Sequence, residues 1–245
     1  MLCVKDLNKS YEGQEILKEI ELYVEKGEFV VIMGRSGCGK STLLYCISGM
    51  DQVSSGEIVF DGKKLSQMDE KAMEELRLHR MGFIFQRTNF LKNLSIEDNI
   101  VFPAYQLGGN RHRIVKEAED LMTDMNIEDI AAHDIRKVSG GQLQRAAICR
   151  AIINHPDILF GDEPTGALNS TAAMEVMNIL NDINQRRHMS ILLVTHDTKV
   201  AARADRVIYL EDGQIKEECK LGRYIKEQQS VREEQLQKWL KKMNF

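Results

Sequence analysis

Apolar and polar side chains alternate along the first part of the chain, over residues 2–10 and 16–24. This alternation predicts two half-buried antiparallel strands. Later runs are apolar throughout or nearly so, which is typical of strands covered on both faces. Further strands are predicted at residues 28–34, 56–62, 82–86, 157–161, 190–195, 206–211 and 214–218, with a hairpin turn at Asp212-Gly213.

Between these strands the apolar positions recur every three or four residues, the period of a helix. Helices are predicted at residues 40–48, 69–80, 95–107 and 111–125 and around 173–183. One apolar face is formed by Ile114, Ala118, Leu121, Met122 and Met125. Apolar strands alternating with amphipathic helices predict an α/β fold with a mainly parallel sheet covered on both faces. The helix-rich stretch at about 87–155 predicts a separate lobe.

Composition narrows the class of protein. A hydrophobic content of 43% and a charged content of 29% are typical of a globular domain. The net charge of −4 is unfavourable for a general nucleic-acid binder. Five scattered cysteines without a CxxC pair indicate a reducing compartment rather than disulfides or zinc. We expect neither a secretory leader nor a membrane span, so that work at a membrane requires a partner.

The segment GRSGCGKS, residues 34–41, fits the phosphate-binding pattern GxxxxGK[ST] between a predicted strand and a predicted helix. Its glycines allow backbone N–H groups to close around phosphate oxygens. Lys40 supplies a positive charge for the β- and γ-phosphates, and Ser41 supplies a hydroxyl for Mg²⁺. The alternative is a glycine-rich turn with a chance lysine.

Polar side chains follow several predicted strands. Asp162 and Glu163 end the strand ILFGD, where one carboxylate can hold Mg²⁺ and the other can activate water. Gln86 is placed to reach Mg²⁺ and the same water, and His196 to contact a γ-phosphate. The ring of Tyr11 is placed to stack on a base. Taken singly, each of these residues also fits an ordinary surface or packing role.

A second anion-binding helix start occurs about a hundred residues after the first. VSGGQLQRAAICRA, residues 138–151, places a small polar triplet directly before a helix. The ordered set GRSGCGKS, Gln86, VSGGQ, ILFGDEP, ALNS and His196 resembles the ATP-binding subunit of ABC transporters over residues 1–220.

The resemblance implies a nucleotide-binding set, a metal-binding set and a catalytic set. The nucleotide set is Tyr11, Gly34, Arg35, Ser36, Gly37, Cys38, Gly39, Lys40, Ser41, Thr42, Ser139, Gly140, Gly141 and Gln142. The Mg²⁺ set is Ser41, Gln86 and Asp162. Glu163 is implied as the catalytic base, His196 as the switch histidine and Gln86 as the coupling glutamine.

The same resemblance implies a fold, a partner and a reason for two anion sites. It implies an ATP-binding domain at 1–221 with a parallel core sheet, an antiparallel β subdomain and an α-helical subdomain at about 87–155, followed by a helical extension at 222–245. Two copies are implied to pair head to tail, so that each ATP lies between one phosphate-binding loop and the other copy's Ser-Gly-Gly. An integral-membrane permease is implied as the partner that holds the subunit at the inner face of the cell membrane.

Residues 138–170 and 83–100 resemble the branch that includes macrolide-efflux, lipoprotein-release and bacitracin-type peptide-resistance ATPases. The Ala-Leu-Asn-Ser form at 167–170 favours the peptide-resistance group. Within this branch 88–99 is implied as the permease groove, with Phe90, Leu91 and Leu94 as apolar contacts; an ordinary surface is the alternative. Asn169 stands where many relatives carry Asp, and Val138 where leucine is usual.

Two features leave alternatives open. Cys38 lies at a helix start, where a thiol tends towards thiolate, and is either a redox switch or a small spacer. In the tail Leu236, Trp239, Leu240 and Met243 predict a short amphipathic helix that packs on its own domain or contacts a membrane, the permease or a second subunit.

Two other functions compete with a transport ATPase. A soluble ABC-type ATPase acting on nucleic acid or ribosomes usually carries two cassettes or a long coiled coil, which are not seen in this sequence. A regulatory subunit without turnover is disfavoured by Glu163, His196 and the complete Ser-Gly-Gly-Gln. Substitution of Glu163 by Gln tests the catalytic assignment, maleimide labelling tests Cys38, and truncation at Gly222 tests the tail.

Overall fold

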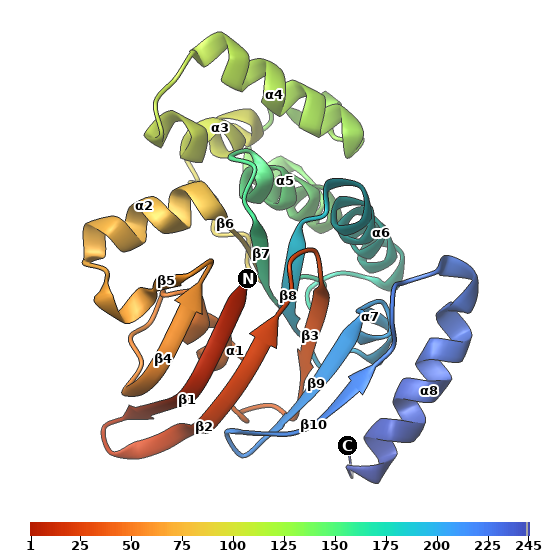
Figure 1. Ribbon diagram of the computed structural model, residues 1–245. Coiled ribbons are helices and arrows are strands. Elements are labelled where there is room, and N and C mark those ends of the chain that lie inside the picture. The colour runs from red at the N-terminus through yellow and green to blue at the C-terminus, as the bar shows by residue number, and fades with distance from the viewer. Residues whose placement is uncertain (244) are drawn as a thin grey trace. The chain divides into compact units, whose positions relative to one another are not determined.

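The structure is a computed structural model that describes residues 1–243 and 245 (Figure 1). Contacts within the chain divide it into two units. The first unit combines residues 1–73 with residues 181–245, and the second unit is residues 74–180.

An antiparallel sheet forms one part of the first unit. Its strands are β1 (Leu2–Tyr11), β2 (Gln14–Val24), β4 (Ser55–Phe60) and β5 (Lys63–Lys64), in the order β2-β1-β4-β5. Successive side chains of a strand point to opposite sides of the sheet. The alternation of apolar and polar residues therefore decides which face of these strands is buried. Leu2, Val4 and Leu7 are buried, with an irregularity in register between the last two.

Buried strands form a second sheet in the same unit. Here β3 (Phe29–Met33) pairs in parallel with β8 (Ser190–Val194) on one side and β9 (Arg206–Glu211) on the other. The last strand, β10 (Gln214–Lys220), pairs antiparallel with β9. Asp212 and Gly213 join them with φ angles of 48° and 77°, so the predicted hairpin turn is of the kind that needs positive φ at both positions.

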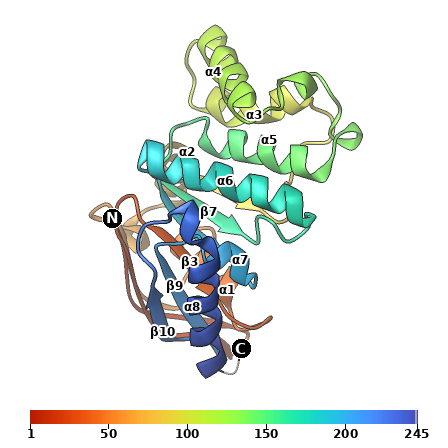
Figure 2. The same cartoon turned by 90° about the vertical axis from the view of Figure 1, so that its right-hand side faces the viewer.

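Three α-helices that the structure describes lie wholly within the first unit. They are α1 (Lys40–Ile47), α7 (Thr198–Ala201) and α8 (Gln229–Lys242). In both ribbon views α8 runs alongside β9, β10 and α7 (Figures 1 and 2). Leu236 and Leu240 of α8 are buried, so the predicted tail helix packs on its own unit. The indole of Trp239 lies edge-on to Tyr209 of β9 and donates to Glu217 of β10 over 3.0 Å.

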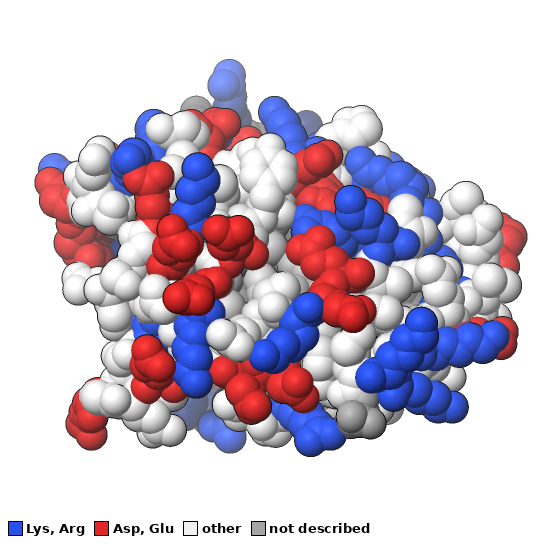
Figure 3. All heavy atoms as spheres, turned by 60° about the horizontal axis from the view of Figure 1, so that its bottom comes forward, with Lys and Arg blue, Asp and Glu red and all other residues white. Residues whose placement is uncertain are grey.

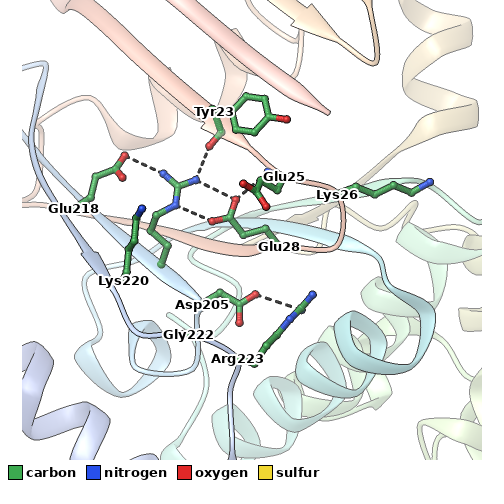
Figure 4. Close-up of a pocket in the computed structure, with 10 residues that line it drawn as sticks. Tyr23, Glu25, Lys26, Glu28, Asp205, Glu218, Lys220, Gly222 and Arg223 are labelled. Carbon is green, nitrogen blue, oxygen red and sulfur yellow. Dashed lines mark hydrogen bonds and ion pairs between the residues drawn. The ribbon is translucent and has the colours of Figure 1, made fainter.

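A cluster of charged side chains lies at the amino-terminal ends of β3 and β9 (Figure 4). The buried guanidinium of Arg206 donates to both carboxylate oxygens of Glu28, at 2.7 and 3.0 Å, and to Glu218 at 2.9 Å. Asp205 pairs with Arg223 at 3.3 Å beside it. These charges border a cavity of about 450 Å³. Arg206 is therefore held by two carboxylates at the end of the sheet opposite the phosphate-binding loop.

The second unit contains a pair of parallel strands and most of the helices. Its strands are β6 (Met81–Phe85) and β7 (Ile158–Asp162), in register from Met81 opposite Ile158 to Phe85 opposite Asp162. Its helices are α3 (Ile96–Gln106), α4 (Arg111–Asp124) and α5 (Gly140–Ile152), with most of α2 (Glu70–Arg80) and of α6 (Ser170–Arg187). On α4, the predicted apolar face is buried at Ala118, Leu121 and Met122.

Short 3-10 helices complete the structure, at Leu65–Gln67, Glu128–Ile130, Ile135–Lys137 and Lys226–Gln228. The prediction of an α/β fold with parallel strands at its core and an antiparallel sheet is confirmed. Among the residues that the structure describes, we find no helix with the length and apolar character needed to cross a membrane.

Candidate nucleotide-binding site

The phosphate-binding loop lies between β3 and α1, as its motif predicts. Gly37 and Gly39 have φ angles of 80° and 101°, which side chains rarely adopt, so glycine is required at both positions. A Cβ at Gly34 would lie 2.2 Å from the carbonyl oxygen of Leu210, so this glycine permits close packing on β9. Gly39 precedes α1 as its cap, so the first turn of this helix starts directly after the glycine-rich loop.

Lys40 is folded into its own loop. Its ammonium donates to the carbonyl oxygens of Gly34 and Arg35, each at 2.8 Å, and only 9% of the residue is exposed. A buried ammonium held by two carbonyl dipoles has little conformational freedom left to lose. The loop therefore presents a fixed positive charge among the N–H groups of residues 34–42.

Tyr11 lies beside the loop helix and remains 45% exposed. Its hydroxyl donates to Asp51, which also accepts from the buried Lys9 at 2.7 Å. The hydrogen bond to Asp51, with a smaller effect of burial, raises the pKa of the Tyr11 phenol to about 12, while a contact with Thr42 acts in the opposite direction. The ring is thus held next to α1, with the Lys9 ammonium 4.4 Å from its centre.

His196 reaches the same sheet edge as the phosphate-binding loop. Because β3 and β8 are parallel and Ile32 is opposite Val194, the residues that follow both strands emerge side by side. The His196 side chain is exposed, and the next residue, Asp197, caps α7 by accepting from the Lys199 N–H at 2.7 Å. The first unit thus brings Tyr11, the loop and His196 together.

The second unit brings together another part of the predicted site. Phe85 pairs with Asp162, so Gln86 and Glu163 follow neighbouring parallel strands. Both residues lie against Gly166. A Cβ added to Gly166 would be 3.0 Å from the side-chain amide nitrogen of Gln86 and 3.4 Å from the Cβ of Glu163. Glu163 has a positive φ of 47°, as several other non-glycine residues of the described chain do, among them Glu12 and Glu19.

The Ser-Gly-Gly segment begins α5 as predicted. Ser139 and Gln142 form a capping box, in which the serine hydroxyl accepts from the Gln142 N–H at 3.3 Å and Gln142 accepts from the Ser139 N–H at 3.0 Å. A Cβ on Gly141 would lie 3.1 Å from that of Ala172, so the first turn of α5 packs closely on the start of α6. Asn169 caps α6 by accepting from Ala172 at 2.9 Å, a role that carboxylates also fill.

Two expectations are corrected by burial. Burial is the largest influence on Cys38 and raises the pKa of its thiol, and the Lys40 charge at 4.0 Å offsets this only in part, so the expected tendency towards thiolate is wrong. Phe90, an expected apolar contact for a partner, is only 8% exposed and lies under the Arg150 guanidinium, 4.5 Å from its ring centre. Leu91 is 47% exposed and Leu94 is half-buried.

Sequence reasoning missed the groups that hold residues 85–94. Arg150 donates to the carbonyl oxygens of Thr88 and Asn89, and its burial lowers the pKa of the guanidinium to about 10. Gln144, also on α5, donates to Phe85, and the buried Asn99 exchanges hydrogen bonds with Leu91. Arg150 and Gln144 thus tie the loop after Gln86 to α5, and Asn99 ties it to α3.

The predicted Mg²⁺ ligands have suitable chemistry. Ser41, Gln86 and Asp162 offer a hydroxyl, an amide and a carboxylate, all of them oxygen donors of the kind that Mg²⁺ prefers. Among the described residues no group of three or more His, Cys, Asp or Glu side chains forms a metal site by itself.

Comparison with known proteins gives consistent results. The ABC transporter family model matches residues 17–166. The chain is 42% identical over 218 residues to the lipoprotein-releasing system ATP-binding protein LolD of Leptospira interrogans, covering 87% of this chain and 90% of that protein. It is 40% identical over 219 residues to the bacitracin export ATP-binding protein BceA of Halalkalibacterium halodurans, covering 88% and 87%.

Two further matches differ in the share of the other protein that the alignment covers. The macrolide export ATP-binding/permease protein MacB of Campylobacter jejuni is 41% identical over 220 residues, which span 90% of this chain and 34% of that protein. Among solved structures, the dimeric post-hydrolysis state of the ATP-binding cassette MJ0796 bound to ADP and Pi matches with a TM-score of 0.85 and 35% identity. That match covers 91% of this chain and 100% of the cassette.

Proposed function

This chain belongs to the ABC transporter family as an ATP-binding and ATP-hydrolysing subunit, and we propose that it powers an exporter by pairing head to tail with a second copy. In this assignment residues 1–221 form the ATP-binding domain, about 87–155 its helical subdomain, and 222–245 a helical extension. Each ATP lies between the phosphate-binding loop of one copy and Ser139, Gly140 and Gly141 of the other. The dimeric cassette among the structural neighbours supports this pairing.

The chemistry follows from the loop residues and the strand ends. Lys40 and the N–H groups of 34–42 hold the phosphates, and Tyr11 stacks on the adenine. Ser41, Gln86 and Asp162 would hold Mg²⁺, which when bound would supply positive charge next to the phosphate oxygens. The Glu163 carboxylate accepts a proton from the attacking water while His196 contacts the γ-phosphate. The observation that carries the catalytic assignment is the convergence of Gln86 and Glu163 after β6 and β7.

Glu163→Gln tests this assignment, because the amide keeps the shape of the side chain and cannot accept the proton. We expect hydrolysis to fall at least about 100-fold with ATP affinity changed by less than about 3-fold. An ATP-dependent dimer should appear by size-exclusion chromatography with light scattering. Glu175→Gln is the matched control. Glu175 is an exposed residue of α6 that forms an ion pair with Arg145 of α5. Unchanged turnover in Glu163→Gln would remove Glu163 from the mechanism.

The exported substrate is proposed to be an antimicrobial peptide or drug, moved through a permease that holds this subunit at the inner face of the membrane. The Ala-Leu-Asn-Ser form at 167–170 supports the peptide class, and a bacitracin exporter is among the relatives. A lipoprotein-release subunit is the alternative, supported by the 42% identical relative. Glu163→Gln protein, tagged and extracted from membranes with Mg-ATP, should retain the permease for identification by mass spectrometry.

The recovered permease separates these classes. A permease with many spans and a large extracellular domain supports peptide export, and a four-span permease with a periplasmic domain supports macrolide-type export or lipoprotein release. Recovery of ribosomal or DNA-bound proteins alone would contradict a transport role. Lysine, arginine and acidic side chains are interspersed on the face shown in Figure 3, whereas a nucleic-acid binder concentrates its positive charge.

A further inference from the structure

Arg232 of α8 is buried and donates only to backbone carbonyls. Its side chain is 3% exposed, and its Nε lies 2.7 Å from the Ala202 oxygen. One terminal nitrogen donates to Ala204 at 2.6 Å and Gly222 at 3.1 Å, and the other to Leu221 at 2.9 Å and Arg223 at 3.3 Å. A guanidinium has five N–H donors, and here each has an acceptor.

These acceptors belong to two segments. Leu221, Gly222 and Arg223 link β10 to α8, so bonds to them fix the start of the tail. Ala202 and Ala204 lie at and just after the end of α7, where unpaired carbonyls attract a positive charge. Gln229, also on α8, donates to Lys199 within α7 at 3.3 Å. The tail helix therefore holds α7 at its carboxyl end.

The segment held in this way begins at the predicted switch histidine. His196 directly precedes Asp197, the cap of α7, and α7 is a single helical turn. The segment is anchored to β3 at both ends, by Thr195 N–H to Ile32 at 3.1 Å and Asp205 N–H to Phe29 at 2.7 Å. Between these anchors Arg232 and Gln229 supply the contacts that α8 makes with the backbone of the segment.

The Arg232 guanidinium donates no hydrogen bond to a carboxylate in the part of the chain that the structure describes, although the charge of Asp205 lies close enough to favour its ionised form. Removal of the charge from water is unfavourable and is offset here only because every donor meets an acceptor, whereas an apolar side chain would pack α8 without that requirement. We propose that Arg232 is a positioning residue for His196. By holding the segment that follows His196, the tail helix would set the rate of ATP hydrolysis. This rests on the proposed function of His196.

The test compares Arg232→Met, Arg232→Lys and Trp239→Phe in the full chain. Arg232→Met removes all five donors at similar length, and Arg232→Lys keeps the charge with fewer donors. Trp239→Phe is the matched control. Trp239 lies on α8 like Arg232, and the substitution removes only its hydrogen bond to Glu217 of β10. We expect kcat to fall on the order of 10-fold in Arg232→Met and less in Arg232→Lys, while KM for ATP changes by less than about 2-fold. Trp239→Phe should leave both constants unchanged.

A double-mutant cycle separates positioning from folding. If Arg232 acts through His196, Arg232→Met should lower kcat no further in a His196→Ala background. Additive losses in the cycle, an unchanged kcat in Arg232→Met, or an equal loss in Trp239→Phe would overturn the proposal. If Arg232→Met does not fold, the same kcat and KM measurements, alone and in the His196→Ala background, are made with Arg232→Lys and Gln229→Ala.

Failure of the proposed function would look different from failure of this proposal. It would appear as a wild-type chain without ATPase activity, or as turnover that does not depend on Glu163. Normal Glu163-dependent hydrolysis with no effect of Arg232→Met contradicts only the positioning role.

Discussion

The ammonium of Lys40 lies 2.8 Å from the carbonyl oxygen of Gly34, six residues before it in the chain. The lysine thus closes the loop whose N–H groups are proposed to bind the phosphates, and a second bond to Arg35 fixes the same nitrogen. This geometry explains why the loop needs both a glycine at 34 and a lysine at 40. The glycine allows the backbone to approach β9, and its carbonyl then orients the charge.

Substitution of Lys40 should therefore remove both charge and loop closure. We expect Lys40→Ala to weaken ATP binding by about 10- to 100-fold, equivalent to about 1.5–3 kcal/mol for a hydrogen bond to a charged group. Lys40→Arg should also weaken binding, because a planar guanidinium does not fit two carbonyls placed for an ammonium. Isothermal titration calorimetry with ATP measures both, with Lys26→Ala as an exposed lysine control. Wild-type affinity in Lys40→Ala would contradict the assigned loop.

Tyr11 offers a test of base stacking. Tyr11→Phe keeps the ring but loses the bond to Asp51, and Tyr11→Ala loses both. Stacking of a base on an aromatic ring contributes about 1–3 kcal/mol, so Tyr11→Ala should weaken ATP binding by roughly 5- to 150-fold. Tyr11→Phe should stay within about 3-fold. Equal affinities in Tyr11→Ala and wild type would show that the adenine lies elsewhere.

Arg150 should control the loop that follows Gln86. Arg150→Lys loses the fork that binds Thr88 and Asn89 and the contact over Phe90. Loss of about 1.5 kcal/mol of charged hydrogen bonding should speed amide hydrogen exchange in residues 88–92 by about 10-fold. Arg145→Lys is the control on the same helix, since Arg145 pairs instead with Glu175. Unaltered exchange in 88–92 would mean that other contacts suffice to hold the loop.

Cys38 should react slowly with alkylating agents. Because burial raises the pKa of its thiol, the thiolate fraction is small at pH 7 and grows as pH rises towards that pKa. Iodoacetamide labelling, followed by peptide mass spectrometry from pH 7 to 9.5, should show slower modification of Cys38 than of glutathione at each pH. Cys38→Ser identifies the modified peptide and should retain ATP binding. Labelling at pH 7 that is faster than that of glutathione would restore the redox-switch interpretation.

Local pattern alone predicted most of the fold and located the residues that are proposed for the site. Period-two and helical apolar patterns are properties of neighbouring residues, and they located the strands and helices of both units to within a few residues. The phosphate-binding loop is equally local, because Gly34, Lys40 and Ser41 act within one turn between β3 and α1. Parallel strands also made the meeting of Gln86 with Glu163 predictable, since each follows a strand.

What only the tertiary structure decided depends on residues far apart in sequence. Arg150 meets Thr88 across 62 positions, which buries Phe90 and removes it from the expected surface. Arg232 donates to Ala202, 30 positions earlier in the chain, and this bond joins the amphipathic tail helix to the segment after His196. The thiol of Cys38 was misjudged for the same reason. A helix start is visible in sequence, but burial, which dominates its pKa, is created only when β3, β9 and α1 pack around the loop.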